Sequence, residues 1–505
     1  MKKENKLILY LYIIFIVLHP FLEIYYLYMD NYKFFGLSIS TIIRTFLVLI
    51  LFVLCFKRWD NKNKYKYFFL FVFINVIYSI LHISVSNNFN VVSLSKTFSL
   101  MGEISYLMKM FVPLLFIFIS YYVLKNFKIN KIVITILAIE IILMIIIPSL
   151  FGFSILSYGG KQEYSMYSIL DWFKGIFVTV PYEKIGVKGI FYQANPLGAT
   201  LAIMISLVNY CYFKYKNSKL LFIITLLNIC SMMLGTRVGT YIWLIIEAGY
   251  VLFYFLSIFM KKQKFSINFF IKYFIVLFVS VVLMFFSPGA NRNKYAGNNA
   301  GNANIENNND PSIKIDYDEN MNDEEKVNVC NLIRKKYNIY GYQLVYFSDN
   351  YKCESDVEFW LNYGKLEFEK KDDGRKIQAL IIKRVSILNK ANFDELFGIG
   401  RTNLHNSKVY LENDILWQYY TLGIFGIIIY LLPYLIIAFL GFKKAFINMT
   451  LEKALLPVTI VLAFAVSYLS GNSFDSWLYM FIMSMVCGMI LVDIRKDSGV
   501  LDDKD

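Results

Sequence analysis

The stretch LFGIGRTNLHNSKVYLENDILWQYYTLGIFG, residues Leu396–Gly426, decides the fold class, because here a long polar segment passes into an apolar helix. The polar segment extends from about Ser287 to Asp414, whereas apolar runs dominate the rest of the chain. Hydrophobic residues make up 57% of the sequence and charged residues only 17%, less than the roughly 25% typical of soluble domains. Runs of about 18 or more apolar residues can each cross roughly 30 Å of hydrocarbon. The sequence therefore predicts an all-α polytopic membrane protein, and it lacks the alternating pattern of barrel strands.

The apolar runs predict about twelve transmembrane helices and three domains. The first run is too long for a signal peptide and lacks a small-residue cleavage site, so we interpret it as a retained span. The spans are expected at 7–29, 36–56, 67–86, 104–124, 131–151, 189–213, 219–236, 238–260, 268–287, 414–440, 454–471 and 473–492. The domains are 1–287 with helices one to nine, an extracytoplasmic loop at 288–413, and 414–505 with helices ten to twelve and a cytoplasmic tail.

Every second connection between the spans is rich in lysine and arginine, which orients the chain by the positive-inside rule. The basic connections are 2–6, 57–66, 125–131, 214–219, 261–272, 443–453 and 495–496. Both termini are therefore expected in the cytoplasm, and the long loop outside a bacterial cytoplasmic membrane. The net charge of +14 follows largely from this topology, so it predicts no nucleic-acid partner. A reaction at the outer face has no ATP or nucleotide sugar, so its donor must carry its own energy.

The long loop divides into a linker and a cap. Residues 291–309 are rich in Asn and Gly and predict a flexible linker. Residues 323–392 have mixed charge, several aromatic residues and helix-like stretches, which indicates a small cap. Cys330 and Cys353 both lie in this loop, where they either form a disulfide or remain two free thiols.

Five basic residues are expected at the outer face: Arg44, Lys109, Arg237, Arg401 and His405. Ionisable groups at membrane depth are costly and usually face a wet cavity. Together these residues predict a site for an anionic ligand, most simply a phosphate or a diphosphate.

The alternatives differ from residue to residue. Arg44 and Lys109 could instead extend their charged ends to the membrane interface. Arg237 lies in the short turn GTRVGT, which needs no arginine for its conformation, and Gly235 and Gly239 allow close approach of a ligand. We therefore interpret Arg237 as a functional residue.

His405 is the candidate general base, because an imidazole accepts a proton near neutral pH. If the stretch is helical, Arg401, His405 and Glu412 share one face at i, i+4 and i+11. The alternative is a histidine that lies at the interface without a role in catalysis. Glu412 and Asp414 are a second possible base, or they orient Arg401 or cap the following span.

Other polar residues give weaker signals. Gln193 and Asn195 open the sixth span and could bind sugar hydroxyls or cap that helix. His19 lies beside Pro20 and is interpreted as a packing residue, and His82 is given no role. The sequence contains no Walker motif, HExxH or CxxC, so neither a cofactor nor a metal is expected.

Three segments together resemble the family of O-antigen ligases and O-antigen polysaccharide polymerases. GIFYQANPLGATLA (Gly189–Ala202) is similar to the Gly-x-Phe…Asn-x-Leu-Ala start of a span in that family. LGTRVGT (Leu234–Thr240) is similar to its outer Ser/Thr-Arg turn. LFGIGRTNLHN with LENDILWQYYTLGIFG is similar to its Gly-x-Gly, histidine and acidic run before Gly-Ile-x-Gly. The motifs cover only a small part of the chain, but their order and the long loop after the ninth span also fit.

The resemblance implies a membrane glycosyltransferase fold of the GT-C-like type that uses an undecaprenyl-diphosphate-linked oligosaccharide and needs no metal. It assigns Arg237 to the turn arginine and His405 to the loop histidine. Arg375 and Arg384 compete for the role of a second loop arginine, and neither has the family's spacing. A flippase and a chain-length regulator are the partners implied besides the lipid bilayer.

The leading hypothesis for function is a polymerase of bacterial surface polysaccharide. It would transfer a glycan chain from undecaprenyl diphosphate to the non-reducing end of a lipid-linked repeat unit. A ligase that uses another cell-envelope acceptor fits the same residues. A flippase or transporter of lipid-linked glycan fits less well, because it predicts inverted repeats and charged residues near the membrane centre.

Overall fold

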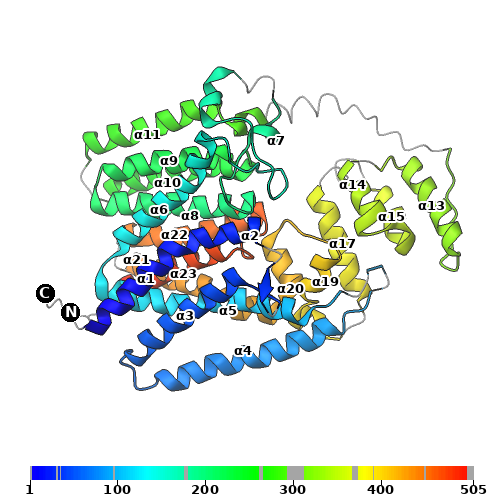
Figure 1. Ribbon diagram of the computed structural model, residues 1–505, viewed down its shortest axis with the longest axis horizontal. Helices are drawn as coiled ribbons and strands as arrows, with labels where there is room; N and C mark the ends of the chain where they lie inside the picture. Colours follow the sequence, from blue (N-terminus) through cyan, green and yellow to red (C-terminus); the bar gives the residue numbers. More distant parts are fainter. Residues whose placement is uncertain are drawn as a thin grey trace. The chain divides into compact units, whose positions relative to one another are not determined.

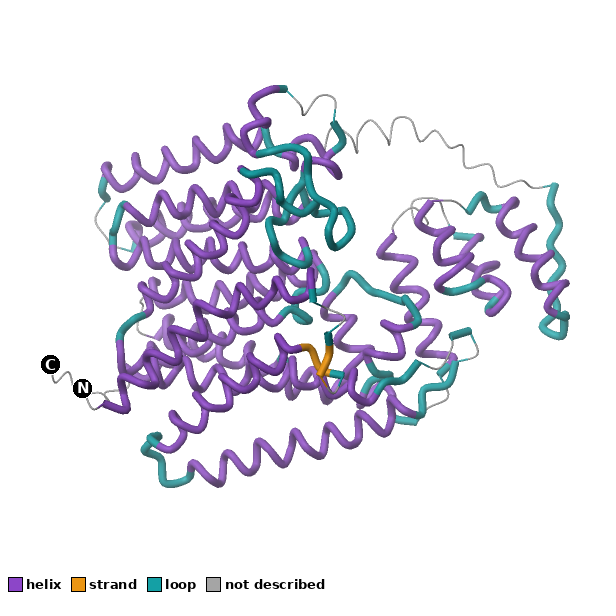
Figure 2. Tube along the Cα trace, viewed as in Figure 1, coloured by secondary structure: helices purple, strands orange, loops and turns teal. Residues whose placement is uncertain are grey.

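Long apolar helices make up most of the chain in the computed structural model (Figures 1 and 2). Among the described residues, eleven helices are long and apolar enough to cross a membrane, and α9 (Lys219–Met233) is a shorter apolar helix. The prediction of an all-α polytopic membrane protein is confirmed. The structure describes residues 3–29, 32–34, 36–91, 93–94, 97–175, 180–260, 265–292, 312–339, 341–366, 374–389, 392–447 and 451–496. Most of the expected Asn/Gly linker lies outside these residues.

The chain forms two compact units, each discontinuous in sequence. Unit 1 comprises Met1–Leu70, Leu107–Gly297 and Tyr430–Asp505, and unit 2 comprises Phe71–Tyr106 and Asn298–Ile429. The helices α4 (Lys64–Asn87), α5 (Leu100–Phe127) and α20 (Asp414–Tyr430) each contain a boundary between the two.

Unit 1 contains most of the apolar helices. They are α1 (Lys3–Phe21), α2 (Tyr25–Tyr28), α3 (Ile39–Lys57), α6 (Asn130–Leu150), α8 (Ala194–Tyr215), α9, α10 (Arg237–Phe259), α11 (Ile267–Phe285), α21 (Leu432–Ile447), α22 (Leu451–Ser470) and α23 (Trp477–Lys496). The strands β1 (Lys33–Phe34) and β2 (Leu37–Ser38) pair antiparallel, with Lys33 opposite Ser38.

Helix α8 is the centre of unit 1, and it packs against α6, α9, α10, α22 and α23 (Figure 1). Nearly all of its side chains are buried, from Ala194 to Phe213. Its polar side chains Thr200, Ser206 and Asn209 are buried as well, and each has a hydrogen-bond partner within the protein. By contrast, α11 is mostly unburied and leaves Phe274, Ile275 and Phe278 exposed, as expected of a helix that faces lipid.

The connection between α6 and α8 folds against the turn between α9 and α10. It carries two isolated bridges, Ile155 to Tyr164 and Leu156 to Val187, and the short helices η2 (Ile169–Lys174) and α7 (Tyr182–Ile185). The Val187 backbone N–H donates to the Met233 carbonyl at 2.8 Å, which attaches this connection to the end of α9.

Unit 2 combines most of α4 and α20 and the first turns of α5 with the helices of the long loop. These are α13 (Asp323–Lys336), α14 (Gly341–Val345), η4 (Tyr346–Asn350), η5 (Cys353–Ser355), α15 (Val357–Gly364), α17 (Gly374–Leu388), α18 (Asp394–Phe397) and α19 (Arg401–Asn406). One hydrophobic core connects them, and it includes Ile333, Trp360, Ile381, Leu404 and Trp417.

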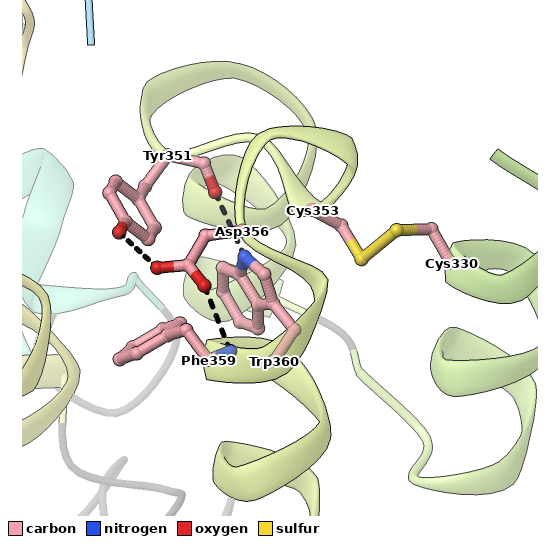
Figure 3. The surroundings of a disulfide bond; sticks show 6 residues. All are labelled: Cys330, Tyr351, Cys353, Asp356, Phe359 and Trp360. Atoms are coloured by element: carbon pink, nitrogen blue, oxygen red, sulfur yellow. Dashed lines mark hydrogen bonds between the residues drawn. A yellow bond between two sulfur atoms is a disulfide. The ribbon is translucent and has the colours of Figure 1, made fainter. Parts of the chain in front are cut away.

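A disulfide holds the cap part of unit 2 together. Cys330 on α13 and Cys353 on η5 are bonded at an S–S distance of 2.02 Å, which resolves the two alternatives left open by the sequence (Figure 3). Next to it, the Asp356 carboxylate accepts hydrogen bonds from the Tyr351 hydroxyl at 2.6 Å and from the Phe359 backbone N–H at 3.1 Å. The cap is therefore an ordered element and not an extended loop.

Candidate functional site

In unit 2, the motif with Arg401 and His405 is built against a break in α20. Gly423 has φ 71° and ψ 179° and interrupts that helix, which frees backbone carbonyls that helical hydrogen bonds would otherwise occupy. The Ile399 N–H donates to the Tyr420 carbonyl at 2.9 Å, and the Gly400 N–H donates to the Thr421 carbonyl at 3.2 Å. Buried polar groups at membrane depth must find such partners within the protein. The Gly-Ile-Gly motif and the broken helix therefore stabilise each other.

Two glycines make this contact possible. A Cβ on Gly423 would lie 2.5 Å from the Gly398 nitrogen, and a Cβ on Gly398 would lie 2.2 Å from the Thr421 carbonyl oxygen. Both residues also have a positive φ, which side chains other than glycine adopt at a cost. The two similar sequence motifs, Gly-Ile-Gly and Gly-Ile-Phe-Gly, are thus two sides of one backbone crossing.

The short helix α19 carries Arg401 and His405 on successive turns. Arg401 is half-buried, and its guanidinium carbon lies 5.4 Å from the centre of the Tyr106 ring. His405 is exposed, and its ring lies edge-on to Tyr410 at 5.3 Å. Helix α19 ends at Asn406, so Glu412 is not on the same helical face, and the i+11 relationship considered above is not formed. The i, i+4 relationship between Arg401 and His405 is present.

The acidic residues after α19 have separate surroundings. Glu412 is half-exposed and pairs with the Arg375 Nε at 3.3 Å, which brings Arg375 to the segment that follows His405. Asp414 is fully buried at the first residue of α20.

Arg384, the other candidate loop arginine, is already paired with carboxylates. Its Nε and one Nη donate to Asp356 at 2.8 and 3.0 Å, and the same Nη donates to Glu358 at 2.6 Å. Two carboxylates compensate its charge, so this arginine connects residues of the cap to one another.

In unit 1, Arg237 is the first residue of α10. The Thr236 side chain accepts a hydrogen bond from the Gly239 N–H at 3.0 Å and caps the helix. The cap therefore does not involve the side chain of Arg237, which is exposed. A Cβ on Gly239 would lie 2.7 Å from the Ser231 carbonyl oxygen, so the turn is tightly packed against α9. The backbone of the turn is therefore held by close packing, while the Arg237 side chain is exposed.

Arg292, which lies within the segment expected to be a linker, contacts this turn as well. Its guanidinium donates to the Gly235 carbonyl at 3.3 Å and to the Tyr158 hydroxyl, and it lies over the rings of Tyr158 and Tyr182. Its two hydrogen-bond acceptors are neutral oxygens, so they do not cancel the positive charge. The sequence signal was weak, because Arg292 begins a run of Asn and Gly residues.

Arg237 and Arg292 act electrostatically on the same two phenols. Burial raises the pKa of Tyr158 to about 12, and the two guanidinium charges oppose that rise. Burial also raises the pKa of Tyr182, a hydrogen bond with Glu183 raises it further, and the charges of Arg292 and Arg237 again oppose the rise. Tyr158 thus keeps its hydrogen, which it donates to the Gly235 carbonyl at 3.1 Å. Two arginines and two tyrosines, with the Glu183 carboxylate beside the tyrosines, form a polar, hydrogen-bonding surface on unit 1.

The remaining candidates of unit 1 have other environments. Arg44 is fully buried and binds Glu23 at 2.7 Å, the His19 Nδ1 at 3.2 Å and the Ser40 hydroxyl, so it does not extend to the interface. Lys109 is half-buried, with its ammonium 3.5 Å from the Asp475 carbonyl oxygen and 6.0 Å from the centre of the Tyr26 ring.

The start of α8 holds the two polar candidates of the sixth span. Asn195 is half-buried in the first turn of α8. Gln193 occupies the N-cap position without a side-chain capping bond, so the capping alternative is not realised by that residue.

A model of one protein family matches residues 4–497, and its description is "O-antigen ligase like membrane protein". The chain belongs to this O-antigen ligase like family. Comparisons with curated proteins and with solved structures gave no match. The family resemblance inferred from the three sequence motifs is confirmed over nearly the whole chain.

Membership in the O-antigen ligase like family makes this chain a membrane protein of cell-envelope glycan processing, and a glycosyl-transferring enzyme in the general sense. Glycines of the three sequence motifs, among them Gly189, Gly239 and Gly423, lie where backbone segments of this protein meet closely.

Proposed function

We propose that this protein is a polymerase of bacterial surface polysaccharide that acts at the outer face of the cytoplasmic membrane. The observation that carries the proposal is that two arginines meet one turn: Arg237 begins α10, and the Arg292 guanidinium donates to the Gly235 carbonyl of the same turn and to the Tyr158 hydroxyl. Arginine binds phosphate oxygens in a planar, bidentate manner, so two adjacent guanidinium groups suit a diphosphate. Arg44 and Arg384, which bind carboxylates, are less suited to this task.

The proposed donor is a glycan chain on undecaprenyl diphosphate, and the acceptor is a hydroxyl at the non-reducing end of a lipid-linked repeat unit. The acceptor oxygen forms a new bond to the anomeric carbon, while the bond from that carbon to the diphosphate oxygen breaks. Undecaprenyl diphosphate leaves with the electron pair. The arginines stabilise the negative charge that develops on the leaving group.

His405 is the proposed acceptor of the hydroxyl proton. It is exposed and therefore accessible to the glycan of a lipid-linked substrate, and an imidazole is well matched to neutral pH. Arg401, one turn earlier on α19, is the proposed second contact to an anionic part of the substrate. Glu412, Asp414, Arg375, Lys109 and Asn195 remain candidates for binding sugar or phosphate.

The test is complementation of a deletion strain with wild type, Arg237→Ala, Arg292→Ala, Arg292→Lys and His405→Ala. Arg334→Ala is the control, because this exposed arginine lies on α13 in the cap. Loss of one charge-assisted contact should reduce polymer formation about 10- to 100-fold for either arginine variant. Arg292→Lys should recover only part of the activity, because lysine lacks the planar pair of donors.

The readout is the length profile of lipid-linked and surface glycan on gels. Single repeat units that accumulate on the lipid, with loss of long chains, support a polymerase. Long chains that persist on the lipid and never reach their acceptor would instead identify a ligase. An unchanged glycan in the deletion strain would refute both.

A further inference from the structure

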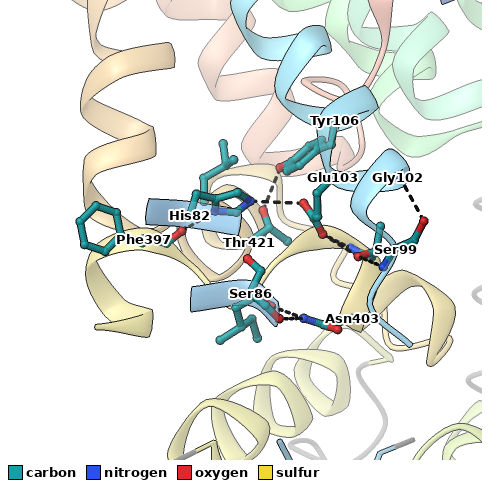
Figure 4. A network of polar contacts seen from close by, with 12 residues as sticks. His82, Ser86, Ser99, Gly102, Glu103, Tyr106, Phe397, Asn403 and Thr421 are labelled. Carbon is teal, nitrogen blue, oxygen red and sulfur yellow. Dashed lines mark hydrogen bonds and ion pairs between the residues drawn. The ribbon is translucent and has the colours of Figure 1, made fainter. Parts of the chain in front are cut away.

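A fully buried carboxylate, Glu103, binds the helix that carries Arg401 and His405. Its Oε1 accepts from the Thr402 backbone N–H at 2.6 Å and from the Thr402 hydroxyl at 2.8 Å (Figure 4). Its Oε2 lies 3.3 Å from the Nε2 of His82, whose ring is also fully buried. Both residues, and α19, belong to unit 2. Neither Glu103 nor His82 received a role from the sequence.

His82 connects Glu103 to a second point on the same segment. Its Nδ1 lies 2.5 Å from the Phe397 carbonyl oxygen, which can only accept, so Nδ1 carries a hydrogen. A hydrogen bond between Nε2 and the Glu103 Oε2 then needs one more proton, which lies either on Nε2, where it makes His82 an imidazolium, or on the carboxyl of Glu103. The pair thus binds the chain just before the Gly-Ile-Gly turn and again just after it.

Glu103 supplies a cap that α19 lacks in its own sequence. The residue before the helix is Gly400, which has no side chain and forms no capping bond. The N–H groups of the first turn need acceptors, and a carboxylate near a helix N-terminus is also favoured electrostatically. Glu103, 299 residues earlier in the chain, provides that acceptor.

Further contacts fix the same helix against α4 and the segment before α5. The Asn403 amide donates to the carbonyls of Ser86 and Ile399, each at 2.7 Å. The Asn406 amide donates to the Thr97 carbonyl at 2.8 Å, and the Thr97 hydroxyl donates to the Asn403 carbonyl at 3.3 Å. The buried side of α19 is therefore bound at several points, while His405 faces outward.

We propose that Glu103 and His82 are positioning residues that fix α19 and thereby place Arg401 and His405 for glycan transfer, an inference that rests on the proposed function. A reactive base must be held to within a fraction of an ångström of its productive geometry. Six residues are too few for a helix to hold its shape alone, so the order must come from outside contacts.

Two substitutions separate positioning by hydrogen bonds from a role of the charge. Glu103→Ala removes all of these contacts. Glu103→Gln keeps an oxygen that accepts from Thr402, and its amide N–H can donate to the His82 Nε2. Positioning by hydrogen bonds therefore predicts that glutamine substitutes well and alanine does not. His82→Ala should resemble Glu103→Ala in a weaker form.

The experiment measures hydrogen exchange of the purified full-length chain in detergent, together with polymer formation in the complemented strain. Glu103→Ala should raise amide exchange in residues 398–406 roughly ten-fold and reduce polymer formation at least ten-fold. Glu103→Gln should restore both to within about three-fold of wild type. Exchange in α8 serves as the internal reference, because unchanged protection there shows that the protein is folded.

Glu247→Gln is the matched control, since Glu247 is a fully buried carboxylate on α10 that is hydrogen-bonded to Asn209, Asn228 and Tyr273. This variant should leave exchange in residues 398–406 unchanged. The proposal is overturned if Glu103→Ala does not raise exchange there, or if Glu103→Gln has normal exchange but no activity. If the deletion strain has normal glycan, the proposed function fails, whereas the exchange data still decide whether Glu103 orders α19.

Discussion

Arg384 and Arg292 are both partly buried but have very different partners. Arg384 binds two carboxylates and Arg44 binds one, whereas the described acceptors of Arg292 are a phenol and a backbone carbonyl. A guanidinium with a carboxylate partner is electrically compensated before any ligand arrives. The partner, and not the exposure, therefore distinguishes arginines that stabilise the fold from those available to bind an anion.

Lys188, in the connection before α8, is a buried ammonium group whose effect on stability depends on pH. The side chain is buried, and this burial lowers the pKa of its ammonium to about 8, against a smaller opposing effect of Glu163. In the unfolded chain the pKa of lysine is about 10.4. The unfolded state therefore binds more protons between these two values, and stability rises with pH across that range.

Lys188→Met should accordingly be more stable than wild type near pH 7, by up to about 3 kcal/mol, because the folded variant no longer buries a charge. The difference should shrink as the pH rises from about 8 toward 10. Thermal unfolding of both proteins in detergent at pH 7 and pH 9.5 measures it. A gap that stays constant, or widens, over this range would contradict the assignment.

At the scale of elements, the break in α20 depends on two glycines that meet. Gly423→Ala should destabilise the crossing with Gly398, because the new Cβ would lie 2.5 Å from the Gly398 nitrogen. We expect a loss of about 2–4 kcal/mol or failure to fold, since backbone atoms cannot move aside as a flexible side chain can.

Gly249→Ala is the control for this prediction. Gly249 lies within α10, and a Cβ there would have no atom within 4 Å. Alanine should therefore be neutral or stabilise that helix by up to about 1 kcal/mol. Thermal midpoints of the two variants measure the difference, and equal midpoints would show that the crossing does not require glycine.

The disulfide between Cys330 and Cys353 is expected to stabilise the cap. Cys330 and Cys353 are 23 residues apart, and a loop of that length gains about 3 kcal/mol from a disulfide in the chain-entropy treatment. Changing both residues to serine should make α13 and α15 sensitive to protease while the membrane helices stay protected. Limited proteolysis followed by mass mapping shows which segment is cut, and a cap that resists cleavage equally in both proteins would argue against this stabilisation.

At the scale of the whole molecule, the alternating basic connections predict which segments face the cytoplasm. The free cysteines among the described residues, Cys55, Cys211, Cys230 and Cys487, are all buried. They should react little with a maleimide, so labelling would report mainly on introduced cysteines. Asp316→Cys in the long loop should react with a membrane-impermeant maleimide in intact cells. Lys443→Cys, near the end of α21, should react only after lysis. Labelling of Lys443→Cys in intact cells would reverse the proposed orientation.

The sequence predicted the features that depend on local composition. Apolar runs located the spans, because lipid demands roughly twenty apolar residues per helix, although α9 has only 15 residues and α20 continues through a break into α21. The pairing of Glu103 with Thr402 could not be predicted, because nothing local to either residue records a partner 299 positions away. Arg292 was missed for a different reason, since it adjoins a low-complexity run and depends on contacts with Tyr158.

The order in which the chain is synthesised bears on that same long-range cap. At about 5–20 residues per second, roughly 15 to 60 s separate the appearance of Glu103 from that of Thr402. During this interval a carboxylate and an imidazole destined for complete burial have no final partner. Until then the two polar groups must be hydrated by water or covered by the insertion machinery. Assembly of unit 2 is therefore a late event in biogenesis, completed only after residue 429 has been made.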